Sequence, residues 1–193
     1  LARAQASLGY LYHGGNGVPL DFALAMEWYA KAADQNDIVG IYGVGQLYEF
    51  GQGVEQDYAK AFEYFQRGAD LGDAYAQADL GYLYDTGNGV AANAEQAAYW
   101  YQRAADQNYA LAQANLAQLY TAGRGVPQDY AAAFDLYTRA HDQGEVSGTV
   151  GLAQAYLYAE GVERDYEQPR ADAQEAADKG SVYGLGTLGY TYS

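Results

Sequence analysis

The sequence of 193 residues carries 25 acidic and 10 basic side chains and therefore a formal net charge of −15. Such a surface repels nucleic acid and anionic membranes, because both are bound mainly through Lys and Arg side chains. The absence of cysteine excludes disulfides and cysteine metal sites, and no apolar run approaches the ~20 residues of a membrane span.

A Gly-x-Gly-Val motif recurs along the chain in steps of 36 residues. Complete copies begin at Gly15, Gly51, Gly87 and Gly123, and a degenerate copy begins at Ala159. A fixed period of this length indicates a repeat array rather than unrelated domains. We therefore predict a single repeat domain over 1–193. Its predicted repeats span about 2–37, 38–73, 74–109, 110–145 and 146–181, with a partial sixth repeat at 182–193.

The first helix of each repeat is predicted from an apolar stripe with the spacing i, i+4, i+7 and i+8, which marks one buried helical face. In the first repeat this stripe consists of Ala4, Leu8, Leu11 and Tyr12. A small residue, here Gly9, follows the leucine column and indicates the close approach of a neighbouring helix. The Gly-x-Gly turn is expected to end the helix, because glycine tolerates a left-handed backbone.

The second helix of each repeat is predicted between two polar columns. An acidic or amide N-cap precedes it, whose side chain can accept hydrogen bonds from free N–H groups; the column is Asp21, Asp57, Asn93, Asp129 and Asp165. A column that holds only Asn and Gly ends it, as a left-handed C-terminal position requires; the column is Asn36, Gly72, Asn108, Gly144 and Gly180. The aromatic stripe between them is expected in the core: Met26, Trp28, Tyr29, Phe62, Phe65, Trp100 and Phe134.

The fifth repeat departs from this pattern. Pro169 replaces an alanine in its second helix, and proline beyond the first helical turn weakens or shifts a helix. A sixth first helix then begins near Gly184 and stops at Ser193 without a partner. An unpaired helix exposes its apolar face, so we expect the native chain to continue.

The consensus Leu-Gly-x-x-Tyr-x-x-Gly-x-Gly-Val-x-x-Asp-x-x-x-Ala-x-x-x-Tyr-x-x-Ala-Ala resembles the Sel-one-like repeat (SLR), a relative of the tetratricopeptide repeat. The resemblance covers nearly the whole chain and departs from the pattern at Ala117, Ala153 and Ala159. It implies an all-α fold, an α/α solenoid wound as a right-handed superhelix, with five helix pairs and one unpaired C-terminal helix. It also implies that the first helices line the concave face, and it favours a bacterial periplasmic or secreted protein.

A second stripe on the first helices holds residues that the repeat does not fix. It contains Ala6, Ala78 and Ala114 besides larger side chains, and by resemblance to tetratricopeptide geometry it faces the concave groove. Exposed tyrosines beside amides and carboxylates are typical of interfaces. The predicted partner-binding residues are Tyr10, Tyr42, Gln46, Glu49, Tyr75, Tyr82, Asp85 and Gln118. The alternative role for these tyrosines is packing between neighbouring first helices.

No catalytic, metal-binding or cofactor-binding residue is predicted. His13 and His141 occupy different columns and are expected in surface or packing roles, because a metal site gathers three or more ligands. Gly184, Gly186 and Gly189 formally match G-x-G-x-x-G. That fingerprint requires a strand-to-helix turn, whereas these glycines fall in the small-residue columns of a repeat helix.

The resemblance implies a non-enzymatic adaptor that binds a peptide or helix of a protein partner in its concave groove. The acidic surface predicts a basic or neutral partner whose binding weakens with salt. A carbohydrate-binding or carbohydrate-hydrolysing envelope protein is one alternative, because tyrosines and carboxylates can bind sugars. A structural spacer within a larger SLR protein is another, with its partner site in the flanking sequence.

Overall fold

The computed structural model describes residues 1–158, 174 and 178, and every regular element within them is a helix. The chain divides into two compact units, Leu1–Asn93 and Ala94–Ser193. The first unit contains α1 (Ala2–Gly14), α2 (Phe22–Ala33), α3 (Ile38–Phe50), α4 (Tyr58–Asp70) and α5 (Ala74–Thr86). The described part of the second unit contains α6 (Ala94–Asp106), α7 (Ala110–Ala122), α8 (Tyr130–Asp142) and α9 (Val146–Tyr158).

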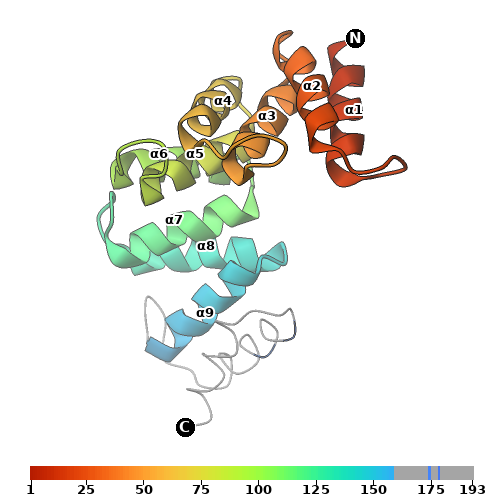
Figure 1. Cartoon of the computed structure of the whole chain (residues 1–193). Helices are drawn as coiled ribbons and strands as arrows, with labels where there is room; N and C mark the ends of the chain where they lie inside the picture. The colour runs from red at the N-terminus through yellow and green to blue at the C-terminus, as the bar shows by residue number, and fades with distance from the viewer. Residues whose placement is uncertain (159–173, 175–177, 179–193) are drawn as a thin grey trace. The chain divides into compact units, whose positions relative to one another are not determined.

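Within each unit, every helix packs against the next one along the chain, so the helices form consecutive hairpins (Figure 1). The first helices of neighbouring repeats also touch, since α1 contacts α3 and α7 contacts α9. These helix pairs confirm the predicted all-α class and its helix-turn-helix solenoid repeats. The second helix of the fifth repeat around Pro169, the partial sixth repeat and the Gly184 fingerprint lie outside the described residues, apart from Gln174 and Asp178.

The helix ends follow the predicted caps. The carboxylates of Asp21, Asp57 and Asp129 each accept a hydrogen bond, 3.0 Å long, from the backbone N–H three residues further on. First helices end on left-handed glycines with φ between 63° and 79°, namely Gly15, Gly51, Gly87 and Gly123. The Asn and Gly column after the second helices is also left-handed, with φ between 59° and 89° at Asn36, Gly72, Asn108 and Gly144.

The apolar stripe of the first helices is buried only where a preceding repeat covers it. Leu80 has an exposed fraction of 0%, whereas Leu8 in the same column is 36% exposed and Ala4 is exposed as well. In later repeats this face lies against the second helix of the preceding repeat, and a Cβ added at Gly40 would lie 2.6 Å from the Cβ of Ala32 in α2. Ala4 and Leu8 are therefore exposed in this structure, contrary to the predicted burial of the stripe.

The small residue after the leucine column makes room for an aromatic ring, as predicted. A Cβ added at Gly9 would lie 2.5 Å from the ring of Tyr29, and one at Gly45 would lie 2.6 Å from the ring of Phe65. Both rings belong to the second helix of the same repeat and are buried. Of the predicted core stripe, Trp100 is also buried. The other members of the stripe are only half-buried: Met26, Trp28, Phe62 and Phe134.

The second glycine of each turn lies against the start of the preceding repeat's second helix. A Cβ added at Gly89 would lie 2.3 Å from the carbonyl oxygen of Tyr58, and one at Gly125 would lie 2.1 Å from that of Ala94. Gly17 has the same left-handed backbone, with φ of 77°, but nothing lies within 4 Å of its added Cβ. The turn therefore sets the distance between consecutive repeats.

Gly89→Ala is expected to destabilise the chain more than Gly17→Ala. Both substitutions place a side chain on a left-handed backbone, which costs about 1–2 kcal/mol. Gly89→Ala additionally forces the new methyl group into the backbone of α4, which should cost about 1–3 kcal/mol more. Urea denaturation followed by circular dichroism measures both losses. Equal losses for the two variants would contradict the close approach of the turn to α4.

Candidate partner-binding surface

Tyrosines of α3 and α5 meet on the first unit. The rings of Tyr42 and Tyr75 are 5.8 Å apart between centroids, and Tyr42 lies 5.7 Å from the buried ring of Phe65. Tyr75 and Tyr82 are 52% and 43% exposed. Two neighbouring repeats therefore contribute to one surface, which we name the α3–α5 surface and define by Tyr42, Gln46, Glu49, Tyr75, Asp79 and Tyr82.

The hydroxyl of Tyr42 joins the polar side chains of this surface. The Gln46 amide donates to it at 3.2 Å, and the hydroxyl in turn donates to the carboxylate of Asp79. Tyr42 and Gln46 are half-buried. Tyr42 therefore has both roles considered from the sequence: its ring packs between repeats, while its hydroxyl orients an acidic group.

Glu49 and Asp79 are neighbouring carboxylates with perturbed acidity. Burial, followed by the negative charge of Asp79, raises the pKa of Glu49 to about 7. Burial is also the largest cause that raises the pKa of Asp79 to about 6, with the charge of Asp73 adding to it and the hydrogen bond from Tyr42 opposing it. Glu49 is 7% exposed, and Asp79 is half-buried. Asp79 is not predicted from the sequence, although its spacing of four residues from Tyr75 and three from Tyr82 places it on their face of α5.

The remaining predicted binding residues are spread along the chain. Tyr10 on α1 is 60% exposed, Asp85 at the end of α5 is half-buried, and Gln118 on α7 is exposed. The second stripe is not exposed along its whole length. Four of its members are buried, with exposed fractions of 7% or less: Ala6, Ala78, Ala114 and Glu49.

A separate hollow of about 410 Å³ lies in the second unit, with its lining drawn from α7, α8 and α9. Its polar lining includes Gln118, Ser147 and Gln154, and the ring of Tyr137 forms part of its wall. A Cβ added at Gly151 would lie 2.3 Å from this ring. The ring can therefore pack this closely on α9 only because residue 151 has no side chain. Only Gln118 of these residues is predicted from the sequence, because the hollow depends on which small residues meet between α7 and α9.

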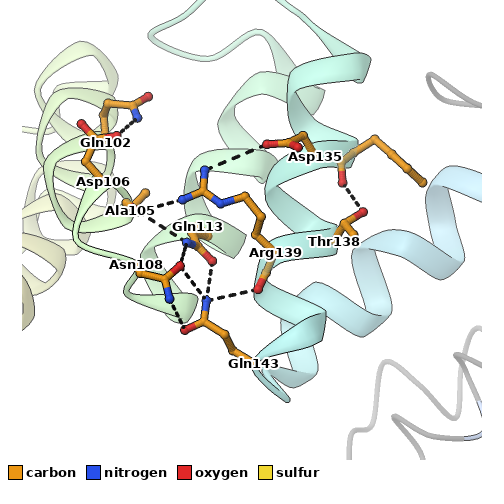
Figure 2. A network of polar contacts seen from close by, with 10 residues as sticks. Gln102, Ala105, Asp106, Asn108, Gln113, Asp135, Thr138, Arg139 and Gln143 are labelled. Carbon is orange, nitrogen blue, oxygen red and sulfur yellow. Dashed lines mark hydrogen bonds and ion pairs between the residues drawn. The ribbon is translucent and has the colours of Figure 1, made fainter.

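Two arginines of the second helices join consecutive repeats. Figure 2 shows Arg139 of α8 reaching back to Ala105, whose carbonyl oxygen it contacts at 3.1 Å, and Gln143 pointing toward Asn108 and Gln113. Arg67 makes the corresponding bond to the carbonyl oxygen of Ala33, at 3.0 Å, in the first unit. The recurrence of this bond in equivalent positions identifies it as part of the repeat rather than as a ligand site.

The two histidines do not converge on a common site. His13 Nε2 lies 2.9 Å from the side-chain oxygen of Gln52, and His141 Nδ1 lies 2.9 Å from the hydroxyl of Thr149. Among the described residues, no group of three or more His, Cys, Asp or Glu could hold a metal ion. In the same part of the chain, no helix has the length and apolarity needed to cross a membrane.

Comparison with known proteins identifies the repeat. The family model of the Sel1 repeat matches residues 2–37, 38–73, 74–109, 110–145 and 147–181. The chain therefore belongs to the Sel1 repeat family, whose proteins are generally non-catalytic scaffolds for protein–protein interaction. These matches confirm the predicted SLR resemblance.

Solved structures show the same fold. A Sel1 repeat protein from Oxalobacter formigenes is 30% identical with a TM-score of 0.92, and the match covers 100% of this chain and 77% of that protein. A protective antigen with an SLR fold from uropathogenic Escherichia coli strains is 31% identical with a TM-score of 0.73. That match covers 98% of this chain and 48% of the antigen, so the chain spans about half of its length. Among curated proteins, no match to the sequence is found.

Raising the pH from 5 to 8 is expected to destabilise the first unit through Glu49 and Asp79. Both carboxyls hold their protons more tightly in the folded chain, with pKa values of about 7 and 6, than in the unfolded chain. Their contribution to stability is therefore full below about pH 4 and is lost as the pH rises through 6 and 7. The Glu49→Gln variant lacks this titrating carboxyl. Its free energy of unfolding should therefore fall by roughly 1–3 kcal/mol less between pH 5 and pH 8 than that of the unmodified chain, since one pKa unit corresponds to about 1.4 kcal/mol.

Urea denaturation at pH 5 and pH 8, followed by circular dichroism, measures the effect. Glu63→Gln provides a matched control, because Glu63 is an exposed residue of α4 in the same unit. The account predicts that the control keeps the pH dependence of the unmodified chain. An unchanged pH dependence in Glu49→Gln would contradict the burial of that carboxyl.

Proposed function

We propose that the chain is a non-enzymatic adaptor that binds a peptide or helix of a protein partner on the α3–α5 surface. The observation that carries the proposal is the pair of exposed tyrosines, Tyr75 and Tyr82, beside the half-buried Tyr42. Tyrosine offers a large contact area at a low entropic cost and keeps a polar tip for hydrogen bonds. Because Tyr75 and Tyr82 lie on the same face of α5, a partner segment can contact both at once.

The charge of the first helices favours a basic or neutral partner. Helices α3, α5, α7 and α9 contain no Lys or Arg, whereas α3 and α5 carry Glu49, Asp79 and Asp85. Complementary charge accelerates association and excludes acidic competitors. Binding should accordingly weaken as salt screens these charges.

The α3–α5 surface also contains two carboxylates, Glu49 and Asp79, which is the feature that the alternative of a carbohydrate-active protein requires. A hydrolase, however, needs both carboxyl groups to reach a sugar ring placed between them. Glu49 is 7% exposed, which leaves room for the end of a narrow side chain rather than for a ring. The arrangement therefore favours a peptide partner over a sugar.

Photo-crosslinking tests the proposed surface. A benzoylphenylalanine residue placed at Tyr75 or Tyr82 is expected to capture one or a few proteins from a lysate of the source cells, and the same residue at Tyr99 is expected to capture none of them. Tyr99 is a matched control, because it is 50% exposed but belongs to a second helix, α6. Mass spectrometry identifies the captured proteins.

Equal capture at Tyr99 would contradict the assignment to the α3–α5 surface. Capture at none of the three positions would favour a spacer role, with the partner site in flanking sequence. Circular dichroism of each labelled chain confirms that the substitution leaves the helices intact.

A further inference from the structure

The carboxylate of Glu49 is buried without a partner. Within the described residues this carboxylate accepts no hydrogen bond and forms no ion pair. The side-chain amide of Gln56 bonds Glu49 at 2.7 Å, but it donates to the backbone carbonyl oxygen and not to the carboxylate. With 7% of the residue exposed, such a carboxylate is costly to ionise unless an opposite charge joins it. Glu49 therefore favours either a bound proton or an opposite charge beside it.

Asp79 provides a second acidic group at the same place. Asp79 lies beside α3, because the hydroxyl of Tyr42 bonds it, and its negative charge acts on Glu49 of the same helix. The hydroxyl of Tyr42 donates to Asp79, and the charge of Asp73 at the start of α5 acts on it as well. These are the titratable groups that act on the pair, and all of the carboxylates among them add negative charge.

No cation of the first unit neutralises this pair in the described structure. Lys31 pairs with Glu27 on α2, Lys60 pairs with the N-cap Asp57, and Arg67 bonds the carbonyl oxygen of Ala33. The remaining basic residue of this unit is Arg3 on α1, and it is not among the groups that act on either carboxyl.

The pair remains reachable from outside. Glu49 is not completely closed off from solvent, since 7% of the residue is exposed. Asp79 itself is half-buried and lies on the same face of α5 as the exposed rings of Tyr75 and Tyr82.

We propose that Glu49 and Asp79 together bind one lysine or arginine side chain of the protein partner, while Tyr75 and Tyr82 contact its aliphatic stem and the flanking residues. This inference rests on the proposed function and names the residue type that the surface recognises. A lysine ammonium carries three donors and an arginine guanidinium five, so either can bond both carboxylates at once. Aromatic rings beside such a cation add a further attraction.

A metal ion fits this site less well than a basic side chain. Calcium takes six to eight oxygen ligands, typically from several carboxylates and carbonyls. The described residues bring no third His, Cys, Asp or Glu into a metal-binding group with this pair. A basic side chain needs no further ligand, because its other donors can face water.

The whole chain is used to select binders from a phage-displayed library of random dodecapeptides at pH 8. The selected peptides are expected to share a Lys or Arg at one position. Replacing that residue by Met in the synthetic peptide, or introducing Glu49→Gln or Asp79→Asn in the protein, should raise the Kd about tenfold or more, as expected for a lost charged hydrogen bond. Glu63→Gln on α4 serves as the matched control and should leave the Kd unchanged.

The pH dependence of binding gives a second readout. Because the pKa values of Glu49 and Asp79 are raised to about 7 and 6, both groups are largely protonated at pH 5 and ionised at pH 8. Binding of the Lys or Arg peptide should therefore weaken on acidification to pH 5. The Met peptide should lose this dependence, as should the protein with both substitutions.

The outcomes separate this inference from the proposed function. Binders that require Tyr75 and Tyr82 but tolerate both carboxylate substitutions overturn the basic-residue site and leave the peptide-binding surface in place. A library without binders, or binders indifferent to Tyr75→Ala and Tyr82→Ala, overturns both. Calorimetry with calcium chloride alone provides a third test. Calcium binding by the unmodified chain that is lost in the Glu49→Gln variant would overturn the basic-residue site and assign the pair to a metal ion.

Discussion

The close approach of each Gly-x-Gly turn to the preceding second helix is the constraint on which the rest of the structure depends. Gly89 lies so near the carbonyl oxygen of Tyr58 that no side chain fits between them. This contact fixes the spacing between consecutive repeats independently of the side chains on the first helices. Those helices are consequently held side by side, while their surface residues remain free to differ from one repeat to the next.

This division of roles explains how a regular scaffold can carry an irregular surface. Glycines at the helix crossings admit the rings of Tyr29 and Phe65. Arg67 and Arg139 of the second helices bond carbonyl oxygens of the preceding repeat. The column of Asp79 holds Ser7, Gly43, Asn115 and Gly151 in the other repeats. Gly43 and Gly151 lie against the rings of Tyr29 and Tyr137 in the preceding second helix, whereas Asp79 is a half-buried carboxylate. An acidic pair arises only where Asp79 on α5 meets Glu49 on α3, so the α3–α5 surface is a property of two adjacent repeats together.

The sequence predicts the structure correctly at helix ends, because the same capping residues recur there every 36 residues. The caps at Asp21 and Asp57 and the left-handed glycine at Gly51 follow from helix ends that recur in each copy. Burial of an individual side chain depends instead on the neighbouring repeat, which a pattern within one repeat does not describe. For this reason Leu8 is exposed and Glu49 buried, contrary to expectation. Asp79 is not predicted, although its charge acts on Glu49.

The contact between the first helices of consecutive repeats is tested most directly by nuclear Overhauser effects in solution. With Tyr42, Phe65 and Tyr75 assigned by selective labelling, the account predicts cross-peaks from the ring of Tyr42 to both other rings, whose centroids lie 5.7 and 5.8 Å away. Cross-peaks from Tyr42 only to residues of its own helix would contradict the account, because α3 and α5 would then not form one surface.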